Sequence, residues 1–128
     1  GAAVGLGNLE EFPRHLARRR EIGARYREEL GKVPGVTLLA YREECQSAYW
    51  LFTMLVEERE RFVRKLAANG IPASVVHQRI DRNGVFGGLT PGLAGQESFE
   101  RSQISIPIHS GLDDEDVSRI ISTIREGW

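Results

Sequence analysis

AYWLFTMLV, residues 48–56, is short and almost entirely apolar. A run of this kind predicts a central β-strand covered on both faces, and we expect it to form the core of the domain. On its C-terminal side, residues 58–69 carry apolar side chains at helical spacing and end in Asn69-Gly70, which stops a helix. Residues 71–76 then predict a further strand.

Toward the N-terminus, Pro34-Gly35 separates a predicted strand over residues 36–41 from a predicted long helix over residues 2–30. Apolar residues recur along that helix at helical spacing. Pro13 removes one backbone donor inside it. We therefore expect the helix to kink at Pro13, or to start afresh with Pro13 in its first turn.

The C-terminal part begins with a Gly-rich connection over residues 81–96, which we expect to be a long loop. Residues 104–108 alternate Ile with polar or Pro residues and predict an edge strand. Asp113 then caps a final helix. The buried stripe of that helix is Val117, Ile120, Ile121 and Ile124. The element order predicts an α+β fold, with helices packed on a small, mostly antiparallel sheet in a single domain over residues 1–128.

Composition and charge exclude several classes of protein. The chain has 128 residues, 41% hydrophobic and 27% charged, which is ordinary for one globular domain. Lys and Arg number 17 against 18 Asp and Glu, so no net field favours nucleic acid or an anionic membrane. The lone thiol of Cys45 indicates a reducing, cytoplasmic compartment. A membrane helix, a targeting signal and an initiator Met are all absent, and the last absence suggests a truncated or processed chain.

No residue is predicted to carry covalent or metal catalysis. His15, His77 and His109 lie outside any Ser, Cys or metal signature. The acidic run at residues 113–116 lacks the spacing of a calcium loop and suits a helix start, where carboxylates favour the dipole. For His109, which precedes a turn, a structural hydrogen bond is the preferred interpretation.

RHLARRR, residues 14–20, supports an alternative function. A stand-alone regulatory module could use this basic helix to bind nucleic acid or a partner protein. The arginines, however, are spread over both sides of the helix without interleaved aromatic residues, and Glu21, Glu28 and Glu29 are available as partners. A solvated face is therefore the favoured interpretation.

VVHQRIDRN, residues 75–83, is the strongest candidate for a binding segment, because a β-like run delivers polar groups into the start of the Gly-rich loop. These groups belong to His77, Arg79, Asp81, Arg82 and Asn83. Two arginines can hold phosphate or carboxylate groups, and an imidazole can donate to a sugar or phosphate oxygen. Alternatively the segment is an ion-paired strand end in which Asp81 satisfies an arginine, and the residues alone do not separate the two.

The chain resembles the carboxy-terminal part of the DegT/DnrJ/StrS-type sugar aminotransferases. The resemblance covers nearly the whole chain and is carried by AAVGLGNLEEF, RRREIGARY, VPGVTL, SAYWLFTMLV, GIPASVVH and ISIPIHSGLDDEDVSRIISTI, in that order. It implies a fold type I, pyridoxal-phosphate-dependent enzyme, a dimer that moves an amino group from a donor amino acid to a nucleotide-linked keto sugar. A related dehydratase is also compatible with the resemblance.

Such chemistry needs a lysine Schiff base and a phosphate cup, which the family carries in a large domain upstream. Lys32 and Lys65, the lysines of this chain, lack the neighbours of a cofactor lysine. The resemblance therefore implies a C-terminal small domain that binds no pyridoxal phosphate alone. It is expected to be inactive without its large domain.

The family also implies which residues meet substrate. In the family, the segment that matches residues 75–83 faces the active-site cleft and helps to hold the nucleotide sugar. The resemblance therefore implies that His77 and Gln78 contact the substrate, and Arg79 after them. Many members have an aromatic residue and a proline after the histidine, whereas this chain has Gln78, Arg79 and Ile80. The departure leaves the identity of the sugar open.

Overall fold

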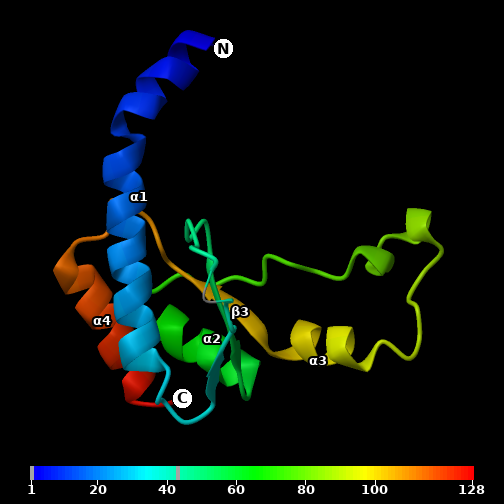
Figure 1. Ribbon diagram of the computed structural model, residues 1–128. Helices are drawn as coiled ribbons and strands as arrows, with labels where there is room; N and C mark the ends of the chain where they lie inside the picture. The colour runs from blue at the N-terminus through cyan, green and yellow to red at the C-terminus, as the bar shows by residue number, and fades with distance from the viewer. Residues whose placement is uncertain (1, 43) are drawn as a thin grey trace.

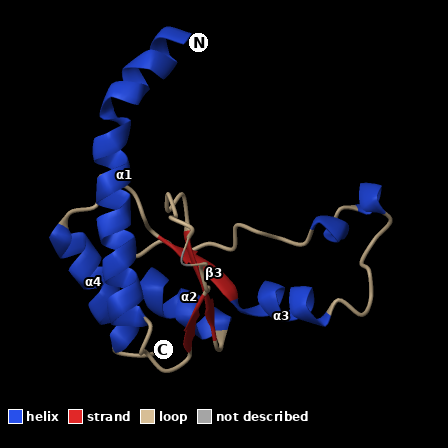
Figure 2. Ribbon diagram, viewed as in Figure 1, coloured by secondary structure: helices blue, strands red, loops and turns tan. Residues whose placement is uncertain are grey.

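The computed structural model describes residues 2–42 and 44–128. Its elements follow one another as α1 (Ala2–Leu30), β1 (Val36–Leu38), β2 (Phe52–Val56), α2 (Arg59–Ala68), the short 3-10 turns η1 (Ile80–Arg82) and η2 (Gly84–Phe86), α3 (Ala94–Ser102), β3 (Gln103–Ile106) and α4 (Asp114–Arg125). Figure 2 shows the strands beside the helices, and the predicted α+β class is confirmed.

β2 is the central strand, as predicted, and pairs antiparallel with β1 on one side and β3 on the other. Buried Phe52 and Met54 alternate with half-buried Thr53 and Leu55. The prediction that both faces are covered is therefore wrong, because only one face is fully buried. The strand also begins later than the apolar run, since Tyr49 has a φ of 47° and interrupts the extended backbone.

The buried face of the sheet packs against α1, α2 and α4 (Figure 2). Tyr26 of α1 meets Phe52 of β2 edge to face, with ring centroids 5.0 Å apart. Its hydroxyl donates to the carbonyl of Pro107 at 2.9 Å, so the phenol is both buried and hydrogen-bonded. The core consists of Ile22, Tyr26, Leu30, Phe52, Met54, Val56, Phe62, Leu66, Ile71, Ile104, Ile106, Ile108, Val117, Ile120, Ile121 and Ile124.

Helix α1 is continuous across Pro13, so it does not start afresh there. Figure 1 shows its N-terminal part bending and rising clear of the body, which agrees with the predicted kink. Large apolar side chains are exposed on this part, namely Val4, Leu6, Leu9 and Phe12. Like every other helix in the described residues, α1 is not long and apolar enough to cross a membrane.

The segment after α2 does not form the strand that was predicted at residues 71–76. Only Ser74 pairs, in an isolated antiparallel bridge to Ser105 of β3. The two N–H groups donate to the two carbonyls at 3.1 and 2.9 Å. Pro72 has no N–H to extend this pairing on one side, and on the other side the chain leaves the sheet.

Residues 77–93 form a long arm that extends away from the body (Figure 1). The loop predicted for residues 81–96 ends early, because α3 begins at Ala94 and runs directly into β3. This helix was missed. Its sequence, AGQESFERS, carries neither an apolar stripe nor a start signal. In agreement with this, none of its residues is fully buried and no side chain caps it.

Helix α4 agrees with the sequence analysis. The Oδ1 of Asp113 accepts the N–H of Asp116 at 2.7 Å, which satisfies one of the unpaired donors at the helix start. The predicted stripe is buried, and Gly127 adopts a φ of 83° just beyond the end.

Candidate functional site

The arm begins at His77, whose backbone is held and whose ring is exposed. Gln103, fully buried at the start of β3, donates its side-chain amide to the carbonyl of His77. The imidazole meets the ring of Trp50 edge-on, with centroids 6.4 Å apart. Gln78 is also exposed. The backbone of His77 is thus anchored to β3, while the side chains of His77 and Gln78 are exposed to solvent.

Arg79, Asp81 and Thr90 form a cluster across the base of the arm, here called the arm latch. The side chain of Arg79 is only 5% exposed, and its Nε and Nη2 lie 2.9 and 2.5 Å from the two Asp81 oxygens. Arg79 also donates to the Thr90 carbonyl at 2.9 Å, and the Thr90 N–H donates to Asp81 at 2.9 Å. The bond from Arg79 has the largest effect, and together with the bond from Thr90 it lowers the pKa of Asp81 to about 2. For this pair, the geometry favours the structural alternative.

Arg82 and Asn83 also have partners within the chain. Arg82 forms an ion pair with Glu100 of α3, which raises the pKa of the guanidinium and lowers that of the carboxyl. The side-chain amide of Asn83 donates to a carbonyl of η1 at 3.1 Å. The predicted site therefore divides into an exposed part, His77 and Gln78, and a part bonded within the arm and to α3.

A pocket of about 330 Å³ opens at the end of the sheet, with Trp50 in its wall. Its lining includes Trp50, Leu51, Pro72, Ile106, Ile108 and His109. The Nδ1 of His109 accepts the N–H of Gly111 at 3.2 Å, so the predicted structural hydrogen bond is confirmed. Trp50 was not predicted as a site residue, because a tryptophan inside an apolar run is expected in the core.

The basic run at residues 14–20 makes contacts inside the domain. Arg18 pairs with Asp114 of α4 at 2.8 Å. Arg19 and Arg20 donate to backbone carbonyls of the loop before β2, at 3.5 and 3.2 Å. Arg18 also pairs with Glu21, one of its predicted partners, at 2.9 Å. The bonds of these arginines tie α1 to its neighbours, so this face is half-buried rather than fully solvated. The alternative of a nucleic-acid or partner-binding module is not supported.

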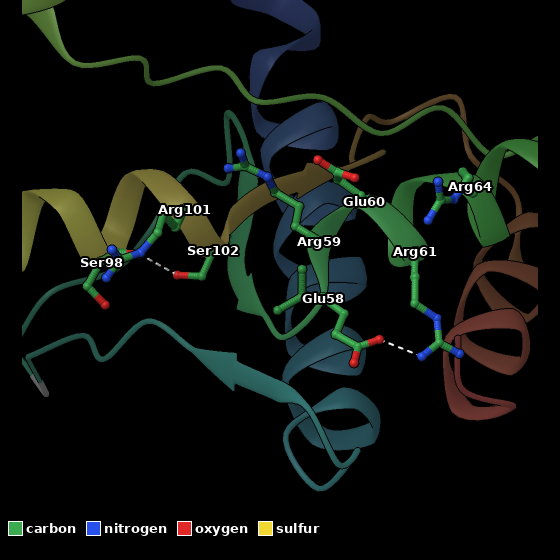
Figure 3. A pocket seen from close by; sticks show the side chains of 9 residues that line it. Glu58, Arg59, Glu60, Arg61, Arg64, Ser98, Arg101 and Ser102 are labelled. Atoms are coloured by element: carbon green, nitrogen blue, oxygen red, sulfur yellow. Dashed lines mark hydrogen bonds and ion pairs between the residues drawn. The ribbon is translucent and has the colours of Figure 1, made fainter.

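A wider hollow of about 780 Å³ lies between the start of α2 and α3 (Figure 3). It is lined by Val56, Glu58, Arg59, Glu60, Arg61, Arg64, Ser98, Arg101 and Ser102. Figure 3 shows Arg61 turned toward Glu58, with a nitrogen-to-oxygen distance of 2.5 Å. Arg59 donates to two backbone carbonyls at the end of α3. Because these two arginines are bonded internally and two carboxylates share the hollow, it is a weak candidate for an anion site.

The family model described as the DegT/DnrJ/EryC1/StrS aminotransferase family matches residues 1–125. This chain belongs to that family. The resemblance inferred from the sequence is thereby confirmed over almost the whole chain.

The DegT-family relatives include enzymes of known name and solved structure. GDP-perosamine synthase of Caulobacter vibrioides is 26% identical, over 96% of this chain and 35% of that protein. The dTDP-3-amino-3,4,6-trideoxy-alpha-D-glucose transaminase of Streptomyces venezuelae is 29% identical, over 98% and 34%. The crystal structure of sugar aminotransferase CalS13 from Micromonospora echinospora matches with a TM-score of 0.93 at 32% identity, over 98% and 34%. This chain thus spans about a third of the length of these relatives.

Aminotransferases of the DegT family depend on pyridoxal phosphate. A cofactor lysine needs a pocket that lowers its pKa and brings it to the aldehyde. Here Lys65 pairs with Glu126 at 2.8 Å, and Lys32 is exposed. Neither of these two lysines therefore occupies a pocket of that kind in the part of the chain that the structure describes. Within residues 2–42 and 44–128, no cluster of His, Cys, Asp and Glu side chains is placed to hold a metal ion.

Proposed function

We propose that this chain is the C-terminal domain of a pyridoxal-phosphate-dependent aminotransferase that acts on a nucleotide-linked keto sugar. The observation that supports it is the family match over residues 1–125, in a chain that spans only about a third of its relatives. The names of those relatives refer to GDP- and dTDP-linked sugars, which suggests that the substrate is a nucleotide-linked sugar. By itself the domain is inactive, because its lysines do not fit the cofactor.

In the complete enzyme a large domain holds the cofactor, and the amino donor binds there. The enzyme is a homodimer of the cytoplasm, a compartment that suits the exposed thiol of Cys45. The exposed apolar side chains of α1 support a covering partner, because monomeric domains rarely leave so much contiguous apolar surface uncovered. When bound, pyridoxal phosphate supplies the electron sink for amino transfer.

His77 and Gln78 form the substrate side of the cleft. An exposed imidazole can donate to a phosphate or sugar oxygen, and a primary amide can both donate and accept. Arg79 and Asp81 hold the arm at its base through the arm latch, while the side chains of Arg82 and Asn83 extend the polar surface along the arm. In this proposal the first two residues contact the nucleotide sugar and the latch positions the arm.

The coding sequence upstream of Gly1 supplies the first test. We expect it to encode a cofactor lysine, and the continuous polypeptide to transfer an amino group from glutamate to a GDP- or dTDP-linked keto sugar. The complete protein should absorb as a pyridoxal-phosphate Schiff base, whereas this chain alone should not. Schiff-base absorption by this chain through Lys32 or Lys65, or dehydration of the sugar without transamination, would contradict the proposal.

Steady-state kinetics of the complete enzyme test the site. His77→Ala should raise the KM for the nucleotide sugar about tenfold, the loss of roughly one hydrogen bond to a charged group, and leave the KM for the amino donor unchanged. Arg42→Ala is the control, because Arg42 is exposed and its ion pair to Glu44 is as long as 4.0 Å. Equal kinetics in His77→Ala and the control would remove His77 from the site.

A further inference from the structure

Trp50 is a large apolar side chain whose exposure is not explained by packing. In a regular strand it would share a face with Phe52, two residues later, and would be buried. Instead the backbone of Tyr49 turns into the left-handed region with a φ of 47°, and the Tyr49 ring stacks with Phe52, centroids 6.1 Å apart. Trp50 is left 71% exposed. A left-handed tyrosine costs about 1–3 kcal/mol, and such strain concentrates at functional sites.

The pocket that Trp50 helps to line is mostly apolar. Pro72, Ile106 and Ile108 contribute apolar surface, and the volume is about 330 Å³, at the lower end of small-molecule pockets. His109 also lines it. Since its Nδ1 accepts a backbone N–H, the neutral ring carries its proton on Nε2 and can donate.

We propose that Trp50 and this pocket bind the nucleobase of the nucleotide sugar, with the base stacked on the indole. This inference rests on the proposed function and adds a residue to it. A planar base matches the indole and the apolar walls better than a hydroxyl-rich sugar does. Because stacking accepts any base, one tryptophan suits both the purine and the pyrimidine nucleotides in the names of the relatives.

The proposal also accounts for the position of His77. Its ring lies beside the indole, with centroids 6.4 Å apart. The ribose and phosphates of a nucleotide whose base stacks on Trp50 need hydrogen-bond donors close to that ring, and the exposed imidazole of His77 is such a donor. Trp50 and His77 thus bind successive parts of one ligand.

Ligand binding to this chain tests the proposal, with dTDP and GDP as probes and glucose 1-phosphate as the probe without a base. Affinity is measured for every probe and variant by saturation-transfer NMR on the ligand protons, and for the wild type also by the fluorescence of Trp50. Trp50→Leu should weaken dTDP binding about tenfold or more, since stacking on an aromatic contributes about 1–3 kcal/mol per base. Trp50→Phe should retain most of the affinity. Trp128, packed on Phe62 and bonded to the Glu57 carbonyl, is the internal fluorescence reference.

The outcomes separate this inference from the proposed function. Nucleotide binding that is lost in His77→Ala but unchanged in Trp50→Leu overturns the role of Trp50 and leaves the proposed function standing. Binding of glucose 1-phosphate as tight as that of dTDP assigns the pocket to the sugar and also overturns it. A chain that binds no nucleotide at millimolar concentration contradicts this inference and leaves the proposed function, which concerns the complete enzyme, standing. Circular dichroism of each variant confirms that the fold is retained.

Discussion

Asp81 carries a charge that holds the arm in place, and its behaviour with pH is predictable. Its pKa is lowered to about 2 by Arg79 and by the Thr90 N–H, from an ordinary value of about 3.9. A carboxyl with a depressed pKa stabilises the folded state above its unfolded pKa, and this contribution is lost as the pH falls through the folded pKa. The arm latch should therefore open between about pH 4 and pH 2.

The amide proton of Thr90 reports this opening directly. In the wild type its NMR shift should titrate with a midpoint near pH 2, and in Asp81→Asn this titration should be absent. Glu44→Gln is the control, since Glu44 is exposed and its carboxyl lies far along the chain from the arm latch. A Thr90 midpoint at the ordinary value of about 3.9 would show that the pair does not form in solution.

The hydroxyl of Tyr26 makes a single buried hydrogen bond whose contribution to stability can be measured. Its buried O–H donates to the Pro107 carbonyl at 2.9 Å, and burial raises its pKa well above the ordinary range. Tyr26→Phe leaves that carbonyl without its donor and should lower the free energy of unfolding by about 1 kcal/mol. Urea denaturation measures the loss, with the exposed Tyr41→Phe as control. Equal midpoints for the two variants would contradict this prediction.

At the scale of elements, α4 depends on its first turn. Asp113→Ala removes the side chain that accepts the Asp116 N–H and should lower the free energy of unfolding by about 1 kcal/mol. Glu115→Ala is the matched control, because it removes an exposed carboxylate from the same turn without removing the cap. If both variants lose the same stability, helix-dipole charge rather than capping supports the helix.

The elements differ in how far their sequences specify them. β2, α2 and α4 were predicted because a short apolar run, a helical stripe and a cap are local signals. α3 was missed since it buries no residue fully, and residues 71–76 were assigned as a strand although Ser74 alone pairs. Whether an extended segment joins a sheet depends on how many donors it can align with its neighbour, which its own composition does not determine.

At the scale of the molecule, the exposed apolar side chains of α1 predict self-association of this chain in the absence of a covering domain. The sedimentation coefficient of the wild type should rise with concentration. Leu9→Lys combined with Phe12→Lys should abolish this rise, whereas Ala17→Lys with Ala24→Lys, which adds equal charge at exposed α1 positions, should not. A wild type that sediments as a monomer at every concentration would contradict the prediction.

The sequence by itself determined the fold class, the central strand and the family, because periodicity, capping and ordered motifs are written along the chain. Only the tertiary structure decided that Arg79 is bound to Asp81, that Arg18 ties α1 to α4, and that Trp50 faces outward beside His77. A guanidinium or an indole has the same character in every context. The role of such a side chain depends on which partner the fold brings within a few ångströms of it. Arg18, for example, joins α1 to α4, two helices from opposite ends of the sequence.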